Sequence, residues 1–117
     1  MRKSLVASLL VVVGVVVGSA PLGAHHAFAA EFDANRPVSF KGTVSKVEWV
    51  NPHVWIHVDV TKPNGTKESW AIEGGTPNVL FRRGVTKQSL KAGIEVAIDG
   101  YQAKDGTRRA NGRDLTL

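Results

Sequence analysis

An eight-residue stretch in the middle of the chain, residues 53–60 (HVWIHVDV), alternates polar and apolar side chains without interruption. One face carries the aliphatic residues Val54, Ile56, Val58 and Val60. The other face carries His53, Trp55, His57 and Asp59. Because successive side chains of a β-strand point to opposite sides, this period of two predicts a strand with one buried face. The chain is therefore expected to build a sheet around that aliphatic face.

Further strands are predicted on both sides of this one. Residues 38–49 also alternate but change phase, which indicates a β-bulge near Lys46. The turn formers of residues 63–65 (PNG) predict a hairpin, so that residues 66–74 return as an antiparallel third strand. Thr76 and Pro77 predict the start of a short helix that closes at Gly84. Residues 94–101 and 108–117 are the fourth and fifth strands.

This order of elements defines the expected fold class. Three strands, one short helix and two strands are the element order of a five-stranded OB-type barrel. We therefore predict a mainly β, OB-like barrel over residues 37–117, preceded by an N-terminal arm over residues 25–36. Another small barrel or a sandwich with the same order is the alternative, because strand order alone does not fix closure.

The N-terminus has the features of an export signal. Residues 1–3 (MRK) are basic at Arg2 and Lys3, and an apolar run from Leu5 to Val17 follows, which is the length of a signal-peptide core and short for a membrane span. We expect cleavage after Ala24, giving a signal peptide over residues 1–24 and a new N-terminus at His25. Cleavage after Ala29 is the alternative. The mature protein is then periplasmic or secreted, with no stable membrane span.

Charge and cysteine content exclude several kinds of functional site. The chain has no cysteine, which excludes disulfides, thiolate metal sites and a cysteine nucleophile. The formal net charge is +5, and removal of Arg2 and Lys3 leaves only +3 on the mature chain. The arginines are interleaved with acidic residues instead of forming one basic face, so we expect no nucleic-acid partner.

Three segments carry a resemblance to a known family. They are HHAFAAEFDANRPVSFKGTVSKVEWVNPHVWIHVDV, WAIEGGTPNVLFRRG and YQAKDGTRRANGR, in that order. Together they resemble the bacterial domain-of-unknown-function family 6152, from about His25 to the C-terminus. The resemblance implies a small exported protein and supplies no catalytic residues. It also implies that members usually continue past the position of Leu117, so we expect this chain to be truncated or a short variant.

All four histidines lie in the predicted mature part, which raises the possibility of a copper site. With cleavage after Ala24, the free amine and ring of His25 could chelate copper together with His26, and His53 is a third candidate ligand. His53 and His57 are four residues apart on one strand, about 13 Å, and cannot share an ion. The alternatives are a disordered arm for His25 and His26, and ordinary strand residues for His53 and His57.

A binding face is the second candidate site. His53, Trp55 and His57 share the polar face of the central strand, and an OB-type barrel binds oligomeric ligands on such a face. An aromatic platform of Trp49, Trp55, Trp70 and Tyr101 is the wider form of this hypothesis, whereas Trp49 and Trp70 fit the core or the barrel rim better. Trp55 is therefore the leading candidate.

These observations favour binding over catalysis. The carboxylates lie on strands as solvated residues, and no nucleophile–base spacing is present. Glycines 74 and 75 lack the accompanying lysine of a phosphate loop. We predict an exported binding or accessory module for a small or oligomeric ligand. A copper-binding protein and an envelope protein-interaction module are the alternatives.

Overall fold

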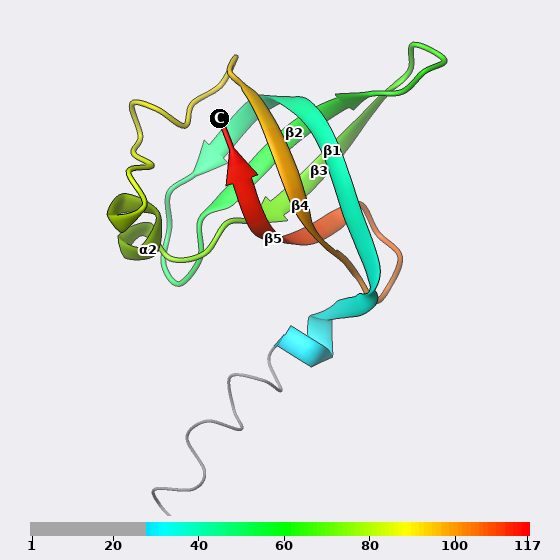
Figure 1. Ribbon diagram of the computed structural model, residues 1–117, viewed down its shortest axis with the longest axis horizontal. Coiled ribbons are helices and arrows are strands. Elements are labelled where there is room, and N and C mark those ends of the chain that lie inside the picture. The colour runs from blue at the N-terminus through cyan, green and yellow to red at the C-terminus, as the bar shows by residue number, and fades with distance from the viewer. Residues whose placement is uncertain (1–27) are drawn as a thin grey trace, which may run out of the picture. The chain divides into compact units, whose positions relative to one another are not determined.

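The structure, a computed structural model, describes residues 28–117 (Figure 1). The chain is mainly β, and its elements are β1 (Phe32–Glu48), β2 (Trp55–Thr61), β3 (Lys67–Glu73), α2 (Pro77–Arg82), β4 (Glu95–Ala103) and β5 (Arg109–Thr116). The five strands form a closed barrel in the order β1-β2-β3-β5-β4. All neighbours are antiparallel except β3 and β5, which are parallel. The described residues contain no helix long and apolar enough to cross a membrane.

The first strand is longer than its sequence pattern predicts. β1 begins at Phe32, inside the segment predicted to be an arm over residues 25–36. Phe32 pairs with Ala103 of β4 and is only 3% exposed, so burial of its ring extends the strand toward the N-terminus. The compact unit accordingly runs from Phe32 to Leu117, and residues 28–31 form a helical turn outside it. The predicted signal peptide, residues 1–24, lies outside the described residues.

β1 bends and pairs with two different strands of the barrel. Its first part pairs with β4 as far as Thr43, and from Thr43 onward it pairs with β2. The register shifts between Val44 and Lys46, which confirms the bulge predicted from the change of phase. Gly42 lies at the bend, where a Cβ atom would collide with the Val58 side chain. The missing side chain therefore lets β1 cross closely over β2.

The barrel is filled by the aliphatic face of each strand. On β2, Ile56 and Val58 are fully buried, as is Val54 just before the strand. They pack with Val44, Ile72, Val96, Ile98 and Ala110. No polar or charged side chain is buried in the described part of the chain. The predicted alternation of β2 is thus confirmed, and its polar face lies on the outside of the barrel.

The short helix α2 lies between β3 and β4, at the opposite end of the barrel from the β2–β3 hairpin (Figure 1). The Thr76 hydroxyl accepts a hydrogen bond from the Val79 amide at 3.1 Å, and Pro77 occupies the first turn. These are the capping features that the sequence predicts. Leu80 is 3% exposed and packs against the core, which anchors the helix to the barrel.

Candidate functional site

The polar face of β2 is positioned by its two neighbouring strands. Trp55 lies opposite Glu48 of β1 on one side and opposite Glu73 of β3 on the other. His57, two residues further along, lies opposite Lys46 and Ala71. All of these side chains lie on the outside of the barrel, because the intervening Ile56 and Ile72 are buried. We call Glu48, His53, Trp55, His57 and Glu73 the Trp55 face.

Each histidine of this face contacts one of the two carboxylates. His57 Nε2 lies 2.9 Å from Glu48 Oε2. His53 Nδ1 lies 3.3 Å from Glu73 Oε1. Both contacts are diagonal, since each carboxylate stands opposite Trp55 and each histidine is two residues away from it. The half-buried indole of Trp55 therefore lies between two histidine–carboxylate pairs.

The hydrogen bond between His57 and Glu48 orients the His57 ring. An ionised carboxylate only accepts hydrogen bonds, so the Nε2 atom of His57 carries the proton that Glu48 accepts. Nδ1 of a neutral His57 ring is then left as an acceptor. The hydrogen bond from His57, followed by the ammonium of Lys46 3.3 Å away, holds the pKa of Glu48 below its ordinary value of 4.5. The Glu48 carboxylate is therefore ionised at neutral pH.

The other aromatic residues do not join this face. Trp49 and Trp70 are partly buried and pack against the core, and the Trp70 ring lies 5.1 Å from that of Phe40. Tyr101 lies on β4, where its hydroxyl is 3.4 Å from Arg113. Neither Trp49 nor Trp70 therefore extends the exposed surface of Trp55, and the structure does not assemble the four-residue aromatic platform. Of these four aromatic residues, Trp55 is the one on the polar face of β2.

The described residues give no metal site. Within residues 28–117, no group of three or more histidine, cysteine, aspartate or glutamate side chains is placed to hold an ion. His53 has Glu73 beside it, and His57 belongs to a different pair. His25 and His26, the main candidates for copper, lie outside the described residues, so that hypothesis stays a prediction.

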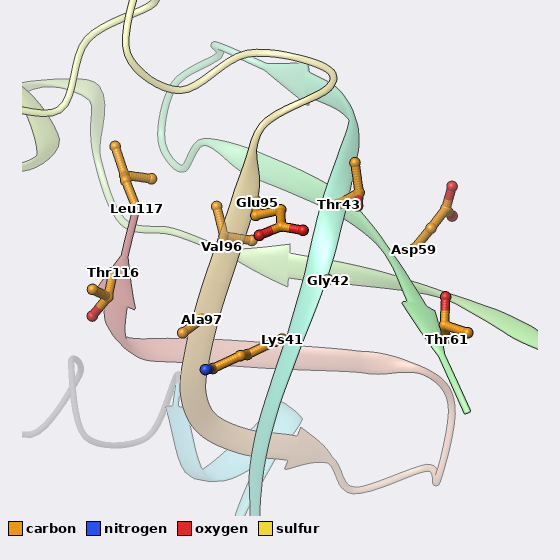
Figure 2. Close-up of a pocket in the computed structure, with 10 residues that line it drawn as sticks. All are labelled: Lys41, Gly42, Thr43, Asp59, Thr61, Glu95, Val96, Ala97, Thr116 and Leu117. Atoms are coloured by element: carbon orange, nitrogen blue, oxygen red, sulfur yellow. The ribbon is translucent and has the colours of Figure 1, made fainter. Parts of the chain in front are cut away.

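A shallow pocket across β4, β1 and β2 was not predicted from the sequence (Figure 2). It has a volume of about 450 Å³ and is lined by Lys41, Gly42, Thr43, Asp59, Thr61, Glu95, Val96, Ala97, Thr116 and Leu117. Figure 2 shows the Glu95 carboxylate directed toward β1, whereas Asp59 and Thr61 lie on β2. Glycine 42, at the bend of β1, is the one sequence signal for this hollow. The pocket lacks an aromatic or imidazole group, so it offers fewer specific contacts than the Trp55 face.

Comparison with solved structures finds a similarity to the N-terminal domain of PriB protein from Thermoanaerobacter tencongensis, described as a dimeric structure. The identity is 20%, the match covers 70% of this chain and 94% of that chain, and the TM-score is 0.46. No curated protein matches the chain. The model of a family of unknown function, DUF6152, matches residues 12–112, which is most of the sequence. The chain therefore belongs to the DUF6152 family.

Proposed function

We propose that this protein is an exported binding module, delivered to the periplasm by a signal peptide over residues 1–24, whose ligand docks on the Trp55 face. The strand order β1-β2-β3-β5-β4, with a helix between β3 and β4, supports an OB-type barrel. In such barrels the outer surface of the second and third strands is the usual ligand-binding face. The Trp55 face occupies that position.

The observation that carries the proposal is the environment of Trp55. Its half-buried indole stands between two carboxylates. Glu48 is hydrogen-bonded to His57, and Glu73 lies 3.3 Å from the ring of His53. A barrel strand needs no such arrangement for folding, because its buried face already supplies the core. An apolar ring surrounded by fixed polar groups is the composition of a ligand site.

The charges of the face favour an uncharged, hydroxylated ligand such as an oligosaccharide. Glu48 and Glu73 both accept hydrogen bonds from hydroxyl groups and repel phosphates. The nearest arginines on β5 and its preceding loop are engaged elsewhere, since Arg108 pairs with Glu68 and Arg109 with Asp105. The indole ring provides an apolar surface on which the flat face of a sugar ring can stack. Lys46, the cation beside this face, is paired with Glu48 at 3.3 Å, so an oligonucleotide would have to compete with that carboxylate for it.

Calorimetric titration with oligosaccharides tests this proposal. The protein would be titrated with chitotetraose and maltotetraose, and with a twelve-residue oligothymidylate for comparison. We expect one of the sugars to bind and the oligothymidylate not to bind. Replacement Trp55→Ala should weaken sugar binding at least about tenfold, because the stacking surface is lost.

The matched control is Phe81→Ala, which removes an exposed aromatic ring that belongs to α2 and is not part of the Trp55 face. It should leave sugar binding unchanged. The proposed site would be wrong if both variants bound like the wild type. Tight binding of the oligothymidylate with no sugar binding would contradict the proposed ligand chemistry.

A further inference from the structure

The end of the barrel that carries α2 exposes large apolar side chains. Phe81 is 70% exposed, Val50 in the β1–β2 loop is 49% exposed and Val79 is 36% exposed. A cavity of about 320 Å³ opens beside them, lined in part by Trp49, Phe81 and Val85. The rest of the lining includes the polar residues Asn78, Thr86 and Gln88. A protruding phenylalanine next to such an open hollow indicates an interaction surface.

The connecting segments at this end are together basic in sequence and are bordered by Glu48, Glu73 and Glu95 at the strand ends. Residues 74–94 contain four cations, Arg82, Arg83, Lys87 and Lys91, and no aspartate or glutamate. The β1–β2 loop, residues 49–54, also lacks acidic residues. Lys87 lines the cavity together with Phe81. We call Val50, Val79, Phe81, Arg82, Arg83 and Lys87 the α2 surface.

Most cations of the rest of the described chain are paired, although Lys41, Lys67 and Lys104 form no ion pair. Elsewhere in the described chain, six cations form ion pairs: Arg36, Lys46, Lys62, Arg108, Arg109 and Arg113. Within residues 28–117, Arg82, Arg83, Lys87 and Lys91 form none. Their charge is therefore free to act on a partner.

We propose that the α2 surface docks peripherally on an anionic phospholipid bilayer. Basic residues beside protruding apolar side chains match an interface that has anionic headgroups outside and hydrocarbon beneath. Val50, Val79 and Phe81 are exposed on a short helix and a loop, and the hollow beside Phe81 also has polar lining residues. This mixture suits the boundary between headgroups and hydrocarbon better than an apolar peptide. The contact is small and reversible.

Vesicle co-sedimentation tests this proposal with protein recovered from the periplasm. Intact mass is measured for every variant, so that only proteins with the same N-terminal residue are compared. The probes are vesicles of pure phosphatidylcholine and vesicles with phosphatidylglycerol. We expect binding only to the anionic vesicles, weakening as salt is added. Phe81→Ala should lower the partition coefficient about tenfold, because an apolar ring no longer enters the interface. Arg82→Gln with Arg83→Gln should lower it about 25-fold, since each cation near the surface contributes about fivefold.

The control is Lys67→Gln with Lys104→Gln, which removes two exposed, unpaired cations elsewhere and keeps the net charge equal to that of the double arginine variant. It should bind anionic vesicles nearly as well as the wild type. Equal binding to neutral vesicles, an equal loss in the control, or no effect of Phe81→Ala would each overturn the proposal. Binding to soluble polyglutamate without binding to vesicles would overturn it in favour of an acidic protein partner.

Discussion

Glu48 is the residue of the Trp55 face whose ionisation is most clearly set by its neighbours. The hydrogen bond from His57, and then Lys46, lowers the pKa of Glu48 in the folded protein. Stabilisation from this lowered pKa is present above the ordinary value of 4.5 and is lost as the pH falls through the lower, folded-state value. We therefore expect the stability difference between wild type and Glu48→Gln to be greatest above pH 4.5 and to shrink in acid.

Urea unfolding at a series of pH values below and above 4.5 measures this difference. Asp59→Asn is the control, because it removes a carboxylate from the polar face of the neighbouring strand β2 and leaves the hydrogen bond between His57 and Glu48 in place. The difference in unfolding free energy between Asp59→Asn and the wild type should change less with pH. A Glu48→Gln difference that stays constant into acid would contradict the stabilising role of the His57 contact.

Gly100 is a second position at which one residue has a large effect. The register shifts between Asp99 and Gly100, and the β4 and β5 backbones approach so closely there that a Cβ on Gly100 would overlap the carbonyl oxygen of Asn111. Gly100→Ala should therefore destabilise the protein by about 1–3 kcal/mol, because the two strands must separate. Ala97→Val, on the outer face of the same strand, should change the urea midpoint little. Similar midpoints for both variants would show that the strands are not in such close contact.

At the scale of elements, the sequence predicts those features that depend on local pattern. The bulge near Lys46, the antiparallel β2–β3 hairpin and the Thr76 cap each follow from a few adjacent residues. The start of β1 does not follow from adjacent residues. Phe32 joins the strand because its ring is buried beside β4, about 70 residues later in the chain, and no local alternation marks that contact.

Two neighbouring residues of the helix α2 test how the helix is held on the barrel. Leu80 is almost fully buried against the barrel, whereas Val79 is 36% exposed. Leu80→Ala should cost about 2–5 kcal/mol of unfolding free energy, because it leaves a cavity under the helix. Val79→Ala should cost less than about 1 kcal/mol, since little of its surface is removed from water. Equal losses in thermal or urea unfolding would mean that α2 is not anchored through Leu80.

At the scale of the whole molecule, the sequence predicted one half of the candidate site. The alternation of residues 53–60 predicts that His53, Trp55 and His57 point to the same side, and in the structure these residues are half-buried while Val54, Ile56 and Val58 between them are buried. The sequence pattern could not predict that Glu48 and Glu73 complete the Trp55 face. A period of two tells which face a side chain occupies, but the residue that lies opposite is set by register, which depends on the bulge and on barrel closure.

The most direct test of the central claim is a proton–nitrogen NMR titration of the isotope-labelled protein with the sugar that binds in calorimetry. The three indole signals report Trp49, Trp55 and Trp70 separately, and a Trp55→Phe variant assigns the second. The account predicts that the Trp55 indole and the amides of Glu48, His57 and Glu73 shift together on addition of the sugar, while the Trp49 and Trp70 indoles move little. Shifts confined to Trp49 and α2, with Trp55 unmoved, would contradict a ligand site on the outer face of β2.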